Sequence, residues 1–149
     1  FEYIAVKLRI ISLELLRIIC GLMMVFGHGY AKMFGDEAQP FTGGKDFFGI
    51  DVGINMLWLA GIIEFYVGIL IVLGLFTRWA SFLMVILMVM AYLSSHLAWF
   101  PTINGGELAM AYFLIFLTIT AYGPGPFSLD VRLFGKSRDG SYREKSVKY

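Results

Sequence analysis

Four long apolar stretches dominate this sequence, at residues 10–33, 54–76, 79–100 and 108–122. A helix needs about 20 residues to cross the hydrocarbon core of a bilayer, with about 17–25 observed. A membrane-spanning strand would need only about 9–11 residues, with apolar and polar positions alternating, and this chain lacks that alternation. The sequence therefore predicts an all-α integral membrane protein, a bundle of four transmembrane helices.

The small share of charged residues indicates that lipid, rather than water, surrounds these helices. Only 15% of the 149 residues are charged and 58% are hydrophobic, whereas soluble domains are about 25% charged and about 45–50% apolar. Helices of a soluble bundle keep a charged stripe, and these stretches are apolar on all faces. The net charge of +1 provides no basic field for a nucleic acid. We expect the lipid bilayer, and no nucleic acid, as a partner.

The distribution of basic residues predicts how the helices are oriented. Cytoplasmic loops of membrane proteins are enriched in Lys and Arg. Four spans place both termini and the short Thr77-Arg78 turn on one side, which holds every Lys and Arg except Lys32 and Lys45. We expect both termini on the cytoplasmic side of a bacterial or archaeal cytoplasmic (inner) membrane. Residues 1–130 would form the transmembrane domain, and the basic tail at 131–149 is expected to be disordered.

Several ionisable residues fall inside the expected spans, and Arg17 and Glu64 are the deepest. Such a residue costs at least about 2.5–3.5 kcal/mol at the bilayer centre and normally faces the bundle interior with a partner. At about 1.5 Å per residue, Glu64 lies roughly 15 Å from the outer boundary and Arg17 roughly 10 Å from the cytoplasmic one. An Arg17–Glu64 ion pair is therefore expected, as a structural pin, as the floor of a ligand cavity, or as both.

The polar and small residues of the first two stretches each share one helical face. In the first stretch they are Arg17, Gly21, Met24, His28 and Lys32, at helical spacing. In the second stretch they are Gly61, Glu64 and Gly68. Small residues on such a face let a neighbouring helix approach closely, so we expect the two faces to meet inside the bundle.

A second polar group is expected near the outer ends of the helices, where His28 and His96 lie at matching depths. Lys32 lies one turn beyond His28, and Glu107 begins the fourth stretch. The imidazoles could ligate a haem axially, or a metal together with Glu107. They could instead hydrogen-bond and pass protons to a quinone head group, or satisfy backbone carbonyls and bridge helices. Haem is the least favoured of the ligands because only this one histidine pair is available, and no metal-binding motif such as CxxC or HExxH occurs.

Residues spaced along the chain resemble the DoxX family of small four-helix membrane proteins, over about residues 17–130. The first stretch is similar to R-x3-G…HG-x2-K, through Arg17, Gly21, His28, Gly29 and Lys32. The second is similar to E-x3-G…LGL-x2-R, through Glu64, Gly68, Leu73, Gly74, Leu75 and Arg78. Residues 104–107 read NGGE, and residues 123–130 are similar to a G-P-G-x-x-S-L-D ending.

The resemblance implies membrane partners in respiratory or sulfur redox chemistry. Relatives include a subunit of thiosulfate:quinone oxidoreductase, and others join oxidative-stress complexes with a superoxide dismutase and a sulfurtransferase. Sulfur transfer usually needs a reactive thiol, and Cys20 lies within an apolar run. Thiosulfate oxidation is therefore not expected of this chain.

The function predicted from the sequence is that of a membrane subunit in a respiratory or quinone-linked redox complex, auxiliary rather than an enzyme by itself. A quinone or other small ligand would bind in a polar pocket formed by Arg17, His28, Lys32, Glu64, His96 and Glu107. One alternative is a non-catalytic accessory subunit that packs on a larger complex through Phe82, Met84, Met88 and Met90. The other is a small haem-binding membrane protein.

Overall fold

The computed structural model describes residues 2–35 and 53–134, and within them every regular element is a helix. The elements are α1 (Glu2–Leu22), η1 (Met23–Gly29), α2 (Tyr30–Phe34), α3 (Met56–Leu73), α4 (Thr77–Ser95), α5 (Glu107–Tyr122) and α6 (Leu129–Phe134). This confirms the all-α prediction. Residues 131–134 of the predicted tail belong to α6, and residues 135–149 lie outside the described residues.

Three helices have the length and apolar composition needed to cross a membrane. They are the continuous helix Tyr3–Phe34 of 32 residues, Met56–Leu73 of 18 residues and Thr77–Ser95 of 19 residues. The fourth apolar helix, α5, has 16 residues, or about 24 Å at about 1.5 Å per residue, against a hydrocarbon core of about 30 Å. The third predicted stretch is also shorter than expected, because the helix ends at Ser95 and turns follow it.

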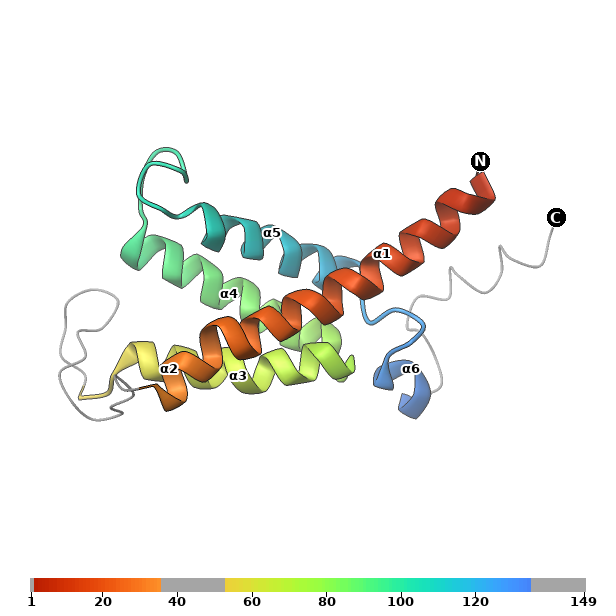
Figure 1. Cartoon of the computed structure of the whole chain (residues 1–149), viewed down its shortest axis with the longest axis horizontal. Coiled ribbons are helices and arrows are strands. Elements are labelled where there is room, and N and C mark those ends of the chain that lie inside the picture. Colours follow the sequence, from red (N-terminus) through yellow and green to blue (C-terminus); the bar gives the residue numbers. More distant parts are fainter. Residues whose placement is uncertain (1, 36–52, 135–149) are drawn as a thin grey trace.

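The helices form a ring of contacts around a thin core. α3 packs against α1, η1, α2 and α4; α4 packs along α5; and α5 closes the ring by contacting α1. Figure 1 shows α4 and α5 side by side, with the N-terminal turns of α1 extending past the other helices. The most deeply buried apolar side chains, Met24, Ile71, Met84 and Phe116, come from the four sides of this ring.

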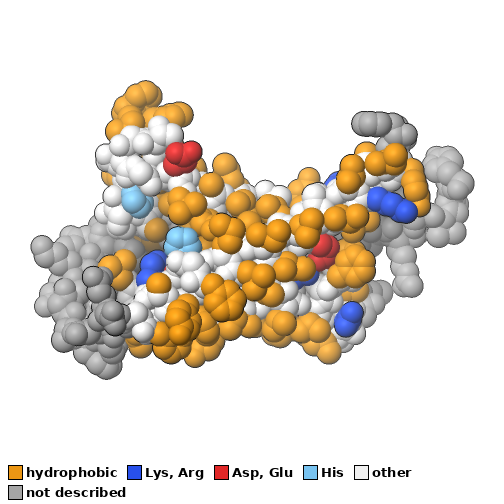
Figure 2. Space-filling model, in the orientation of Figure 1, with side chains coloured by type: hydrophobic (Ala, Val, Ile, Leu, Met, Phe, Trp, Pro, Cys, Tyr) orange, Lys and Arg blue, Asp and Glu red, His pale blue; other side chains and the backbone are white. Residues whose placement is uncertain are grey.

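The outer surface of the ring is apolar over most of its length. Figure 2 shows hydrophobic side chains along the helices of the face in view, with charged groups confined to a few places. Trp79, at the start of α4, is 73% exposed, and Trp99, just beyond its end, is 89% exposed. Tryptophan is enriched at membrane–water interfaces. An apolar exterior with exposed tryptophans at both ends of a helix matches lipid as the surrounding solvent.

Methionines that were expected on an outer packing face belong to the core instead. Met84 is 0% exposed and Met88 is 5% exposed, whereas Phe82 is 47% exposed. The expectation was wrong for these two methionines because α4 turns them toward α5 and the ring interior. Of that proposed face, Phe82 is exposed and Met90 is partly exposed, so these two remain available to lipid or to a partner.

Glycines allow the long N-terminal helix and α3 to pack with their backbones in close contact. A Cβ added at Gly29 would lie 2.6 Å from the backbone N of Phe65, and one added at Gly61 would lie 2.6 Å from the Cβ of Lys32. One at Gly68 would lie 2.7 Å from a methyl carbon of Val25. The close approach expected from the small residues is therefore present. It brings the Lys32 side chain directly over α3.

Candidate functional site

Lys32 and Glu64 form an ion pair between α2 and α3. The ammonium Nζ of Lys32 donates to Oε1 of Glu64 at 2.7 Å, with the Glu64 side chain 4% exposed and that of Lys32 32% exposed. The predicted Arg17–Glu64 pair is therefore wrong. The Arg17 guanidinium lies level with the carbonyls of Ile71 and Val72, about 10–12 Å further along α3 than Glu64.

The second carboxylate oxygen of Glu64 is left without a protein partner. Oε2 is buried and makes no hydrogen bond to any residue that the structure describes. An unsatisfied buried polar group costs about 1–3 kcal/mol, and more when it is charged. Such an atom requires a physical explanation, and a bound molecule that donates to it is one.

Glu64 lines a partly open cavity of about 300 Å³ to which all four sides of the helix ring contribute residues, and we call it the polar cavity. Its lining comprises Met24, His28, Lys32, Glu64, Met88, Ala91, His96, Gly105, Leu108, Ala109 and Tyr112. In Figure 2 the histidine side chains gather at the end of the molecule where α2 and the α4–α5 loop lie. The cavity is mostly apolar with a few convergent polar groups, which is the usual character of a small-molecule site.

Four of the six residues predicted for the site line the polar cavity: His28, Lys32, Glu64 and His96. Glu107 does not line it, because its side chain is exposed at the first turn of α5. Arg17 does not line it either, because its partners lie near the opposite end of α3. The outer cluster predicted around the two histidines is thus present without Glu107, and the carboxylate that joins it is Glu64.

His96 is held by the turn that precedes α5. Its Nδ1 lies 2.8 Å from the backbone oxygen of Asn104. A carbonyl oxygen can only accept, so this contact assigns a proton to Nδ1 and leaves Nε2 of the neutral ring as an acceptor. Gly106 permits the arrangement, because a Cβ there would lie 2.8 Å from the Cβ of His96.

His28 lies in η1, where the long helix changes from α to π geometry. The N–H of Tyr30 donates to the carbonyl of Val25, five residues earlier, which is the bonding pattern of a π-helix. The His28 ring meets the ring of Tyr112 edge-on, with centroids 5.6 Å apart at 88°. Short π segments inside α-helices are frequent at functional sites.

Sequence reasoning missed Tyr112, which is 4% exposed and stacks on Phe116 with centroids 6.0 Å apart. Its position could have been inferred from the sequence, because residues 112, 116 and 119 share one face of α5 at helical spacing, and that face is buried. It also missed the π-helix, although glycines on both sides of His28 indicate a flexible backbone there.

At the far end of α3, Arg17 forms a second buried polar group that we call the Arg17 cluster, comprising Glu14, Arg17, the carbonyls of Ile71 and Val72, and the N–H of Phe127. Arg17 Nη2 donates to Glu14 Oε2 at 2.6 Å, and Nη1 donates to each of the two carbonyls at 2.7 Å. Glu14 Oε1 accepts from the N–H of Phe127 at 2.9 Å. Arg17 thus satisfies C-terminal carbonyls of α3, and Glu14, which it orients, holds the segment before α6; both roles are structural.

Asp130 completes the packing at this end. Its Oδ1 accepts from the N–H of Phe76 at 2.7 Å, and its Oδ2 accepts from the N–H and hydroxyl of Thr77 at 2.9 Å each. The carboxylate therefore caps α4. Gly74 has a positive φ of 68°, and a Cβ there would lie 2.5 Å from the Cβ of Ser128. These contacts explain the LGL and G-P-G-x-x-S-L-D patterns as structural.

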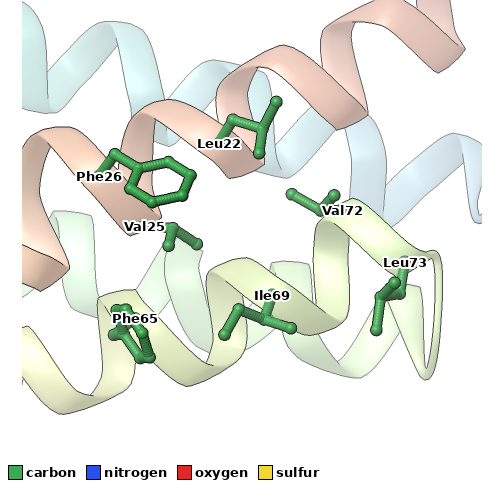
Figure 3. A pocket seen from close by; sticks show the side chains of 7 residues that line it. All are labelled: Leu22, Val25, Phe26, Phe65, Ile69, Val72 and Leu73. Atoms are coloured by element: carbon green, nitrogen blue, oxygen red, sulfur yellow. The ribbon is translucent and has the colours of Figure 1, made fainter.

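A separate groove of about 200 Å³ lies between α1–η1 and α3 and has only apolar side chains. Figure 3 shows them: Leu22, Val25, Phe26, Phe65, Ile69, Val72 and Leu73. It contains no group for proton transfer, ligation or hydrogen bonding. The polar cavity, rather than this groove, is the candidate site.

A family model for DoxX matches residues 12–97. The chain belongs to the DoxX family. The matched segment of this DoxX protein contains Arg17 and the cavity residues His28, Lys32, Glu64 and His96, while Tyr112 lies beyond it. The family assignment confirms the resemblance seen in the sequence and, with the apolar helices, identifies a membrane protein.

A protein of Haemophilus influenzae (strain ATCC 51907 / DSM 11121 / KW20 / Rd), described as uncharacterized, is 42% identical to this DoxX protein over 135 residues. The match covers 87% of this chain and 96% of the relative. No solved structure matches the chain.

Two further features bear on the chemistry of this DoxX protein. Cys20, its single cysteine, is 7% exposed and belongs to the core. Over residues 2–35 and 53–134, no three His, Cys, Asp or Glu side chains are grouped so that they could hold a metal ion. The polar side chains that line the polar cavity can form hydrogen bonds with a bound molecule.

Proposed function

We propose that this DoxX protein is a membrane subunit of a quinone-linked redox complex and that the polar cavity binds the head group of a quinone or quinol. The observation that carries the proposal is the ionised Lys32–Glu64 pair at the wall of a cavity inside an apolar helix ring. Ionisable residues within membrane helices are costly, and those that persist mark ligand or proton sites by default.

The size and lining of the cavity support a single-ring head group. A volume of about 300 Å³ lies at the lower end of the range for small-molecule sites. Met24, Met88 and Leu108 supply apolar contacts, and the ring of Tyr112 lies beside the imidazole of His28. A flat, amphiphilic ring with polar atoms at opposite edges matches this combination.

The polar groups support hydrogen bonding at both edges of such a ring. Lys32 and Glu64 lie together on the α2–α3 side, and His96 lies at the end of α4. The ring nitrogens of His28 and His96 can donate or accept hydrogen bonds. The ligand's isoprenoid tail would remain in the lipid around the helices.

Partner subunits are part of the proposal because some DoxX relatives are subunits of respiratory or sulfur redox complexes. The distribution of basic residues supports both termini on the cytoplasmic side of a bacterial or archaeal cytoplasmic membrane. With that orientation, the polar cavity opens near the outer surface of the membrane.

Filling the cavity tests the proposal. Ala91 lines the polar cavity, whereas Ala111 on α5 is exposed on the outside of the ring. We expect Ala91→Phe to weaken binding of decylubiquinone to the detergent-purified protein at least about tenfold, and Ala111→Phe, which adds the same side chain facing lipid, to leave it unchanged. Isothermal titration calorimetry measures both affinities.

Equal binding by wild type and Ala91→Phe would contradict the assignment of the cavity. If wild type binds no quinone and co-purifies stoichiometrically with other subunits, the accessory-subunit alternative replaces this proposal. A Soret band in protein purified from native membranes would favour the haem-binding alternative.

A further inference from the structure

We infer that the polar cavity selects the reduced, hydroxyl-bearing form of its ligand, a hydroquinone, over the oxidised quinone; this inference rests on the proposed function. A hydroquinone has two hydroxyl groups that donate hydrogen bonds, whereas a quinone has two carbonyl oxygens that only accept. Which form binds more tightly depends on whether the cavity lining offers mainly hydrogen-bond acceptors or mainly donors.

The first unmet group is the buried Oε2 of Glu64. Lys32 donates to Oε1 of the same carboxylate at 2.7 Å, and a carboxylate paired with an ammonium is an acceptor only. Oε2 has no partner among the described residues. A hydroxyl placed beside it would donate to it, whereas a quinone carbonyl there would bring two acceptors together.

The second acceptor is Nε2 of His96, a residue that also lines the cavity. The Nδ1 proton is used on the backbone oxygen of Asn104 at 2.8 Å, so Nε2 of the neutral imidazole carries a lone pair. His96 lies at the end of α4, whereas Glu64 lies in the middle of α3. The cavity thus offers two acceptors from different helices, as a molecule with two hydroxyl groups requires.

The donors that line the cavity do not reverse this preference. Lys32 has protons beyond the one that contacts Glu64, but its side chain is 32% exposed, so water and lipid head groups can accept from it. The Glu64 oxygen is buried and has no such alternative. The hydroxyl of Tyr112 and a neutral imidazole at His28 each both donate and accept, and they therefore serve either form of the ligand.

The size of the effect follows from the acceptor that a quinone would leave unsatisfied. Leaving a buried polar group without a partner weakens binding by about 10-fold to 100-fold. We therefore expect the reduced ligand to bind at least about tenfold more tightly than the oxidised ligand of the same ring and tail.

The test compares decylubiquinol and decylubiquinone on the same purified protein under anaerobic conditions, by calorimetry. Glu64→Gln presents an amide that can keep its oxygen toward Lys32 and turn its N–H into the cavity, so the preference should fall below threefold or reverse. Glu107→Gln makes the same chemical change at an exposed site outside the cavity lining, at the same end of the bundle, and should leave the preference intact.

Equal affinities for the two forms in wild type, or tighter binding of the quinone, would overturn this inference and leave the proposed quinone site standing. Binding of neither form would overturn both. Because the wild-type comparison needs no substitution, the inference is decided even if Glu64→Gln fails to fold.

Discussion

Lys32 and Glu64 lie 2.7 Å apart across the α2–α3 contact, and their ion pair uses only one of the two carboxylate oxygens. The pair forms because Gly61 lets α2 approach α3, where a Cβ would lie 2.6 Å from the Cβ of Lys32. Glu64 also lines the polar cavity. The close helix contact and the candidate ligand site therefore depend on the same residues.

Replacing Lys32 by Met is expected to destabilise the protein because it leaves a buried carboxylate without its cation. Breaking a fully buried pair costs about 3–5 kcal/mol. Since the Lys32 side chain is 32% exposed, we expect a smaller loss of about 1–3 kcal/mol. The double variant Lys32→Met/Glu64→Gln also removes the negative charge of Glu64 and should be more stable than Lys32→Met alone. Thermal unfolding in detergent measures the stability of the two variants. A double variant less stable than Lys32→Met would contradict an ionised Glu64.

Replacing Arg17 by Lys is expected to cost about 2–4 kcal/mol, although the charge is kept. The two guanidinium nitrogens Nη1 and Nη2 together contact Glu14 and the carbonyls of Ile71 and Val72, and a single ammonium cannot reproduce that geometry. Arg132→Lys, on an exposed position of α6, should change stability by no more than about 0.5 kcal/mol. The unfolding midpoints of the two variants provide the comparison. Equal unfolding midpoints would show that the planar guanidinium of Arg17 is not required for stability.

Alanine substitutions on either side of His28 should have different effects. A Cβ at Gly29 would lie 2.6 Å from the Phe65 backbone, whereas one at Gly27 meets nothing within 4 Å. We expect Gly29→Ala to destabilise the protein by about 1–3 kcal/mol and Gly27→Ala to remain within about 1 kcal/mol of wild type. Because both substitutions flank the same imidazole, the difference isolates the α3 contact. Equal unfolding temperatures would argue against the close packing of η1 on α3.

The sequence was sufficient to predict which residues of the first helix face inward but not which partners they contact. The spacing of Arg17, His28 and Lys32 predicts a common face, and all three are at least partly buried. The expected Arg17–Glu64 pair failed because pairing depends on how far two helices are offset along their axes. The structure places Arg17 level with the last turn of α3, and it is Lys32 that lies level with Glu64.

Hydropathy alone determined that this chain is helical and that lipid surrounds it, because the hydrophobic effect and backbone hydrogen bonding in a bilayer depend on composition and segment length. Its spaced motifs likewise determined the family. Only the tertiary structure decided that Lys32 pairs with Glu64, that Arg17 holds the end of α3, and that Tyr112 joins the cavity. These contacts follow from helix offset, rotation and the π-helix at His28, which are set when side chains of different helices pack together.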